Sequence, residues 1–226
     1  MRSIILVNPN TSRSTTLMMV EIAQAEADSR ARIEGMTAES GAPLITDERA
    51  LSEAADAVEA LAPAIDARLP DGVIVSAFGD PGLAGLRAAM TCPVTGIAEA
   101  AMLEAASDEA GRPRPFSVVT TTPLLAASIT ARASIYGHQA RFAGVRVTPG
   151  DPATLMANQR AVTEALALAC EEAIRLDGAE ALVIGGGPLA LAARALRPRF
   201  KVPIIEPIPA AVRLALRRLE KSARPD

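Results

Sequence analysis

Two stretches of the sequence place small and polar residues where an α/β protein positions a ligand. Residues 71–81 (DGVIVSAFGDP) predict a buried strand at Gly72–Val75 that runs into a loop of small and polar residues. Residues 177–188 (DGAEALVIGGGP) repeat this design about half the chain later. Ligands of parallel sheets bind outside the carboxyl ends of the strands. We therefore expect both loops to face a ligand.

Two further loops, Asn8–Ser12 and Thr120–Thr122, follow apolar runs in the same way. Together the four loops offer hydroxyls, amides and glycine backbone, and uncharged donors of this kind suit a carboxylate or an enolate-like anion. Their candidate binding residues are Asn8, Asn10, Thr11, Ala77, Phe78, Gly79, Thr120, Thr121, Gly185, Gly186, Gly187 and Pro188.

The candidate catalytic residues are one hydroxyl, Ser76, and three carboxylates, Asp80, Glu99 and Glu206. A positioned carboxylate can act as a general acid or base. Asp80 could instead cap the helix that follows it, and Glu99 could serve the first turn of its helix. Glu206 lies between Ile205 and Pro207, where burial would raise its pKa.

Composition and charge exclude several other functions. Aromatic residues form 2% of the 226 residues, there is no Trp, and the net charge is −3, so we expect no nucleic-acid or lipid partner. The basic cluster of Arg217, Arg218, Lys221 and Arg224 is interpreted as a solvated last helix and tail. The chain shows neither a signal-peptide pattern nor an apolar run of bilayer length, so we expect a cytoplasmic protein.

The cysteines and the histidine give no metal or triad pattern. Cys92 and Cys170 have no metal-site spacing, and Cys170 is expected to be a packed thiol. The single histidine, His138, is interpreted as a surface or capping residue, with a catalytic base as the alternative. A dinucleotide site at Gly185–Gly187 is disfavoured because too little sequence follows to complete its sheet. We expect neither a metal nor a cofactor.

The order of elements is the same in both halves of the chain. Strands are predicted at 3–7, 32–36, 72–75, 93–97, 116–119, 144–147, 181–184 and 202–205, and helices at 14–27, 50–69, 82–90, 99–107, 124–136, 157–176, 189–195 and 208–221. Such alternation predicts an α/β fold of two pseudo-symmetric lobes, each a mostly parallel sheet flanked by helices, with the active-site cleft between them. The first lobe is expected at 1–98 plus 208–226 and the second at 99–207, with a linker at 108–115.

Three motifs resemble a known family. Residues 7–12 (VNPNTS), 78–83 (FGDPGL) and 96–100 (GIAEA) are similar to the aspartate/glutamate/hydantoin racemase superfamily, and most similar to its hydantoin racemase branch. The resemblance covers nearly the whole chain. It implies two pseudo-symmetric α/β lobes, a site between them and no cofactor.

The chain departs from this family at the residues that matter most. The family's racemases use two cysteines, one from each lobe, and the motifs place these at Ala77 and Gly186. The related arylmalonate decarboxylase keeps one of the two thiols, whereas this chain has neither. Two-thiol racemisation therefore cannot run at these positions, and the small residues there would enlarge the pocket.

The resemblance implies an oligomeric, cofactor-independent enzyme that acts on a small carboxylate or hydantoin-like cyclic ureide through an enolate-like anion. The reaction could be isomerisation, decarboxylation or hydrolytic ring opening. The alternative of a different class is a non-catalytic protein that binds a small anion.

Overall fold

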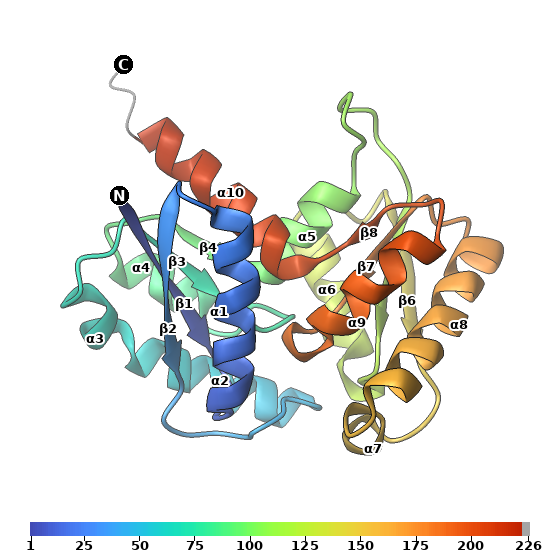
Figure 1. Cartoon of the computed structure of the whole chain (residues 1–226), viewed down its shortest axis with the longest axis horizontal. Helices are drawn as coiled ribbons and strands as arrows, with labels where there is room; N and C mark the ends of the chain where they lie inside the picture. Colours follow the sequence, from blue (N-terminus) through green and yellow to red (C-terminus); the bar gives the residue numbers. More distant parts are fainter. Residues whose placement is uncertain (223–226) are drawn as a thin grey trace. The chain divides into compact units, whose positions relative to one another are not determined.

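The computed structural model describes residues 1–222 and divides the chain into two compact units (Figure 1). The first unit comprises Met1–Ile45, Arg49–Ala100 and the chain from Ile208 onward. The second comprises Thr46–Glu48 and Ala101–Pro207. The part of the predicted first lobe at 223–226, which includes Arg224, lies outside the described residues.

The first unit is built on a parallel sheet of four strands in the order β2-β1-β3-β4. The strands are β1 (Arg2–Asn8), β2 (Ala31–Thr37), β3 (Gly72–Val75) and β4 (Val94–Gly96). The helices are α1 (Arg13–Ala27), α2 (Glu48–Ala60), α3 (Ala62–Asp66), α4 (Leu83–Ala89), α5 (Ile97–Ala105), whose last residues belong to the second unit, and α10 (Pro207–Ser222).

The second unit repeats this topology, with a parallel sheet in the order β6-β5-β7-β8. Its strands are β5 (Phe116–Thr120), β6 (Phe142–Val147), β7 (Ala181–Ile184) and β8 (Ile204–Ile205). Its helices are η1 (Pro123–Leu125), α6 (Ala126–Ile135), α7 (Pro152–Met156), α8 (Gln159–Asp177), η2 (Gly187–Leu189), α9 (Ala190–Leu196) and η3 (Arg197–Arg199). Two four-stranded parallel sheets with flanking helices confirm the predicted α/β class.

The central strands are continuous apolar runs because helices cover both faces of each sheet. Along β1, Ile5 and Val7 pack into a core with Val58 of α2, Ile65 of α3 and Leu86 of α4. In the second unit, α8 and α9 supply the matching layer on β5, β7 and β8. The packed core of each unit therefore fixes the positions of its strand ends.

Several predicted elements differ from the structure, and three of the differences have a clear physical reason. The helix predicted at 50–69 is two helices, α2 and α3, because Pro63 has no N–H and its ring clashes with a helical carbonyl four residues earlier. The helix predicted at 157–176 begins at Gln159, where the Asn158 side chain caps it. The linker predicted at 108–115 lies within the second unit and forms a turn closed by Asp108 and Arg112.

Candidate functional site

The loops after β3 and β7 occupy matching places in the two sheets. The Ser76 N–H donates to the Val7 carbonyl, and the Gly185 N–H donates to the Val119 carbonyl, each at 2.8 Å. Val7 lies beside Val75, and Val119 lies beside Ile184, in the strand register. Ala77 and Gly186 are therefore equivalent residues, each the second after its strand.

The loop after β1 is organised by the side chain of Asn8, which is fully buried. Its amide nitrogen donates to the Asn10 Oδ1 at 2.8 Å, to the Ser12 carbonyl at 3.1 Å and to the Thr16 hydroxyl at 3.0 Å. Ser12 in turn caps α1 by accepting from the Thr15 N–H. Asn8 therefore holds the loop rather than presenting a free group to a ligand.

Two groups on this loop remain available. Asn10 is 4% exposed and uses its Oδ1 internally, but its amide nitrogen donates to no acceptor among residues 1–222. The Thr11 hydroxyl also has no hydrogen-bond partner within that range, while the Thr11 N–H donates to the Ala42 carbonyl. Both groups lie at the carboxyl end of β1.

Ser76, the first residue after β3, points into its own unit. It is 2% exposed, and its hydroxyl donates to the Met19 sulfur at 3.1 Å. The residues after it, Ala77 and Phe78, are buried, and Gly79 adopts a positive φ of 117°. The contact with Met19 favours a packing role for Ser76 over the catalytic role expected from the sequence.

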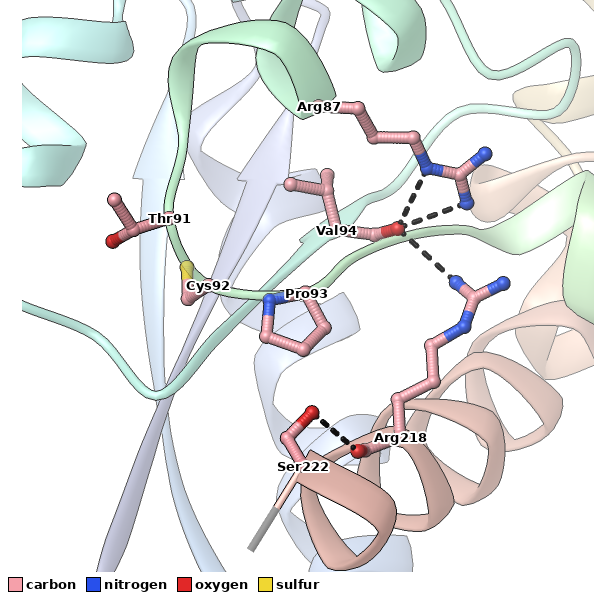
Figure 2. A pocket seen from close by; sticks show the side chains of 7 residues that line it. All are labelled: Arg87, Thr91, Cys92, Pro93, Val94, Arg218 and Ser222. Atoms are coloured by element: carbon pink, nitrogen blue, oxygen red, sulfur yellow. Dashed lines mark hydrogen bonds between the residues drawn. The ribbon is translucent and has the colours of Figure 1, made fainter. Parts of the chain in front are cut away.

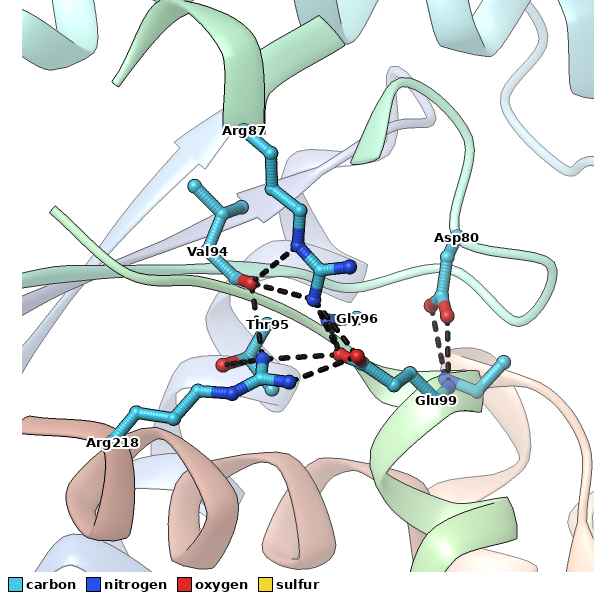
Figure 3. Close-up of polar contacts among 8 residues, drawn as sticks. Asp80, Arg87, Val94, Thr95, Gly96, Glu99 and Arg218 are labelled. Carbon is cyan, nitrogen blue, oxygen red and sulfur yellow. Dashed lines mark hydrogen bonds and ion pairs between the residues drawn. The ribbon is translucent and has the colours of Figure 1, made fainter. Parts of the chain in front are cut away.

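Asp80 ties this loop to the start of α5. Its two carboxylate oxygens accept from the Ala98 N–H at 2.9 Å and the Glu99 N–H at 2.8 Å, and the residue is 1% exposed (Figure 3). A Cβ on Gly96 would overlap this carboxyl group, so a larger residue there would displace the Asp80 side chain. The Asp80 carboxylate thus stabilises the N-terminus of α5, whereas at the start of α4 it is the backbone carbonyl of Asp80 that accepts from the Leu83 N–H.

Glu99 is held by two arginines from distant parts of the chain. Arg87 of α4 donates to its carboxylate at 2.7 Å and Arg218 of α10 at 2.8 Å (Figure 3). Burial alone would raise the pKa of Glu99, but the hydrogen bonds and charges of Arg218 and Arg87 outweigh it and lower the pKa. Glu99 is therefore an ionised structural anion, and Arg218 is not the solvated residue that the sequence suggested.

In the second unit the loops after β5 and β7 touch directly. The Thr120 hydroxyl donates to the Gly185 carbonyl at 2.9 Å and lies 3.0 Å from the Thr122 hydroxyl. Thr121 is 3% exposed, between these two. Gly186 has a φ of 153°, and Pro188 lies in the short helix η2 that follows. The structure therefore brings the predicted Thr120–Thr122 and Gly185–Pro188 loops together.

Glu206 follows β8, next to the loop after β7. It is 5% exposed, and its Oε1 lies 3.2 Å from the Arg197 Nη1. Its Oε2 lies 3.6 Å from the Arg194 Nε but has no hydrogen-bond partner among the described residues. The predicted burial of Glu206 is confirmed, and its Oε2 is a buried oxygen that accepts no hydrogen bond from the described residues.

The Asp/Glu/hydantoin racemase family model matches residues 4–215 of this chain. The chain belongs to this family. A hydantoin racemase of Paenarthrobacter aurescens is 29% identical over 215 residues, 94% of this chain and 89% of that protein. An allantoin racemase structure from Klebsiella pneumoniae matches with a TM-score of 0.89 and 29% identity, over 98% of this chain and 89% of that one. The allantoin racemase of Pseudomonas fluorescens matches with a TM-score of 0.87 and 31% identity, over 97% and 92%.

The cysteines of this racemase-family chain lie away from the two equivalent positions. Cys170 of α8 is fully buried, which confirms the predicted packed thiol, and burial raises its pKa to about 12. Cys92 is half-buried and lies just before β4. Its pKa is raised mainly by burial and, to a smaller extent, by the negative charges of Asp66 and Asp71. Neither thiol is poised as a thiolate.

His138, the single histidine, lies in a packed environment. His138 packs edge-on against Phe116 at 6.1 Å, and burial lowers its pKa. Within residues 1–222, no group of three or more His, Cys, Asp or Glu side chains could hold a metal ion. No helix in that range has the length and apolar character needed to cross a membrane.

Sequence reasoning missed the arginines that partner the candidate carboxylates. Arg218 reaches Glu99 across 119 residues, and no pattern in the sequence joins the two. Arg194 and Arg197 lie only 12 and 9 residues before Glu206. Arg194 and Arg197 are spaced i and i+3, so they lie on one helical face shortly before a buried carboxylate. This spacing is the signal in the sequence that could have identified them as partners of Glu206.

Proposed function

We propose that this racemase-family protein is a cofactor-independent enzyme that acts on a small carboxylate or a hydantoin-like cyclic ureide through an enolate-like anion, without a cysteine pair. The observation that carries this proposal is the equivalence of Ala77 and Gly186. These are the positions to which the family resemblance assigns the two thiols, and both lie at the carboxyl ends of central strands.

Backbone donors around these two positions support the stabilisation of an anion. The N–H groups of Ala77, Phe78 and Gly79 donate to no acceptor among residues 1–222, and the same holds for Gly186 and Gly187. Successive unpaired N–H groups make a concave anion-binding site, and donors fixed in advance stabilise the charge that develops in a transition state. Asn10 adds a side-chain donor on the loop after β1.

Glu206 is the carboxylate that best fits proton transfer in place of a thiol. Asp80 and Glu99 use their oxygens to hold α5 and two arginines, so their protonation would cost structure. Glu206 also pairs with two arginines, Arg194 and Arg197, but its Oε2 accepts no hydrogen bond from the described residues. It lies at the edge of the sheet that carries Gly185 and Gly186. A carboxylate in such a position can act as a general base.

The decisive experiment follows the α-proton of the substrate. A 5-substituted hydantoin and allantoin are each incubated with the protein in D2O, and NMR measures exchange at the α-carbon while polarimetry measures inversion. We expect exchange that depends on the protein, and Glu206→Gln should lower its rate about 10²–10⁴-fold, the usual contribution of a general base. The matched control is Glu164→Gln, because Glu164 is an exposed carboxylate that pairs with Arg199 on the surface of the same unit.

The same samples distinguish the other reactions on this scaffold. Release of CO2 from a substituted malonate would assign a decarboxylase, and loss of the ring would assign a hydrolase. Decarboxylation needs one proton transfer and hydrolysis needs one water, and neither reaction needs two opposed thiols. The lack of thiols at Ala77 and Gly186 therefore favours these two reactions. Exchange that is unchanged in Glu206→Gln would remove Glu206 from the mechanism.

One observation favours a non-catalytic role as the second candidate. Two of the three candidate carboxylates, Asp80 and Glu99, are committed to structural contacts, while the unpaired backbone donors remain. A protein of this kind would bind a small carboxylate and be stabilised saturably against heat. It would show no deuterium exchange, no CO2 release and no ring opening with any of these compounds.

A further inference from the structure

A recess of about 420 Å³ opens beside the edge strand β4, in the first unit (Figure 2). Its walls come from the end of α4, the segment before β4 and the end of α10, and they include Arg87, Thr91, Cys92, Arg218 and Ser222. These residues lie before or beside β4, whereas the loops of the proposed reaction follow the carboxyl ends of the strands. A volume of this size is within the range of small-molecule sites.

Positive charge exceeds negative charge at the arginine end of the recess. Arg87 and Arg218 approach the Val94 carbonyl from opposite sides and share the single carboxylate of Glu99 (Figures 2 and 3). Two guanidinium groups and one carboxylate leave one net positive charge. The arginine side chains are 38% and 28% exposed, so this charge is within reach of a solute.

Each arginine also keeps donors that the protein does not use. The Arg87 Nη1 and the Arg218 Nε have no hydrogen-bond acceptor among residues 1–222. The contacts with Glu99 and Val94 fix both planar groups, so little conformational entropy is lost when a further acceptor binds. Guanidinium groups held in this way recognise carboxylate or phosphate oxygens.

The remaining walls limit what else can enter. Thr91 adds an exposed hydroxyl, and Pro93 adds an apolar surface. The charges of Asp66 and Asp71 act on Cys92, so the thiol end of the recess disfavours a second negative group. A ligand with one anionic end and a small neutral body fits this distribution of charge.

We propose that the recess beside β4 is a binding site for a small oxyanion, a carboxylate or a phosphate monoester, held by the unused N–H groups of Arg87 and Arg218. The site is independent of the proposed reaction because none of its residues belongs to the loops after β1, β3, β5 or β7. It would let a metabolite bind to the protein without competing with the substrate.

Cys92 supplies the reporter for the test, because it lines the recess and Cys170 is fully buried. The rate of alkylation by iodoacetamide, a neutral reagent, is measured by mass spectrometry as inorganic phosphate, methyl phosphate or acetate replaces chloride at constant ionic strength. We expect saturable protection of Cys92, with a rate at least fivefold lower at saturation, from a phosphate or a carboxylate probe. Protection by one probe and not the other identifies the class of oxyanion.

Two variants make the test specific. Thr91→Asp places a negative charge at the rim without touching the arginine contacts and should abolish protection, whereas Thr91→Asn should keep it. Arg87→Lys retains the charge but loses the planar fork and should weaken protection at least fivefold, with circular dichroism as the check on folding. An alkylation rate that no probe changes, or equal protection in wild type and Thr91→Asp, would overturn the proposal.

Discussion

The backbone at Gly186 allows a quantitative prediction about the cost of any side chain there. Its φ of 153° and ψ of 126° lie in a region that residues with a Cβ rarely adopt. A Cβ would also lie 3.2 Å from the Leu189 Cδ1 and 3.3 Å from its Cγ. Backbone strain of this kind costs about 1–3 kcal/mol. We therefore expect Gly186→Ala to lower the free energy of unfolding by about 2 kcal/mol.

Two other glycines separate the sources of this cost. Gly72→Ala is the neutral control, because the new Cβ would meet only ordinary contacts of 3.5–3.8 Å with Pro93 and Leu219. Gly144 has a φ of 142° and open space around it, so Gly144→Ala reports the backbone cost alone. The double variant Gly186→Ala/Leu189→Ala removes the contact and leaves the backbone strain.

The assay is urea unfolding followed by circular dichroism, with thermal melts as a second measurement. A loss of 2 kcal/mol should lower Tm by about 4–8 °C in a chain of this size. Gly144→Ala should lose nearly as much as Gly186→Ala, and Gly72→Ala should change stability by less than about 0.5 kcal/mol. A Gly186→Ala protein as stable as Gly72→Ala would refute the reasoning.

Three further predictions follow from the contacts in the first unit. Glu99→Gln should cost about 2 kcal/mol at pH 7, because each of its arginine partners loses a charged acceptor. Folding lowers the pKa of Glu99, so this stabilisation is present above the unfolded pKa of about 4.3 and is lost as pH falls through the folded value. In urea titrations, the difference in stability between Glu99→Gln and wild type should therefore be smaller at pH 3 than at pH 7. A difference that stays constant would contradict this prediction. Gly96→Ala should cost at least about 2 kcal/mol in the same titration because its methyl group meets the Asp80 carboxyl group, and a neutral effect would count against that contact. Mass spectrometry after alkylation at pH 8.5 should find Cys92 modified and Cys170 untouched until the protein unfolds, and early modification of Cys170 would contradict its burial.

The fold could be predicted because its signals are local. The apolar runs at 3–7 and 72–75 each end in polar or small residues, and alternation of such runs with helical segments specifies parallel sheets. The break at Pro63 was missed because the apolar face continues across it, although proline is the residue that interrupts a helix. The ends of several other helices and strands differ from the predicted ends by a few residues, because capping side chains decide where the first turn of a helix begins.

The candidate site could be predicted only in part, for a physical reason. Loops at the ends of central strands are visible in the sequence, and the structure puts Thr120 in contact with Gly185 as that pattern suggests. The protonation and partners of a carboxylate depend instead on which distant side chains reach it. The sequence leaves Asp80 and Glu99 open as acids or bases or as helix-terminal groups, because Arg218 and the N-terminus of α5 are not visible in it as their partners.

The two arginines on the Val94 carbonyl also bear on how this protein could associate with other chains. In β4 this carbonyl faces away from β3, because the neighbouring Pro93 carbonyl accepts from the Val73 N–H. An edge strand whose N–H and C=O groups are unpaired can pair with a strand of another chain, by β-augmentation or amyloid-like growth. A foreign strand would have to displace two guanidinium groups that are themselves anchored to Glu99. The two arginine contacts therefore disfavour self-association of the first unit through this strand.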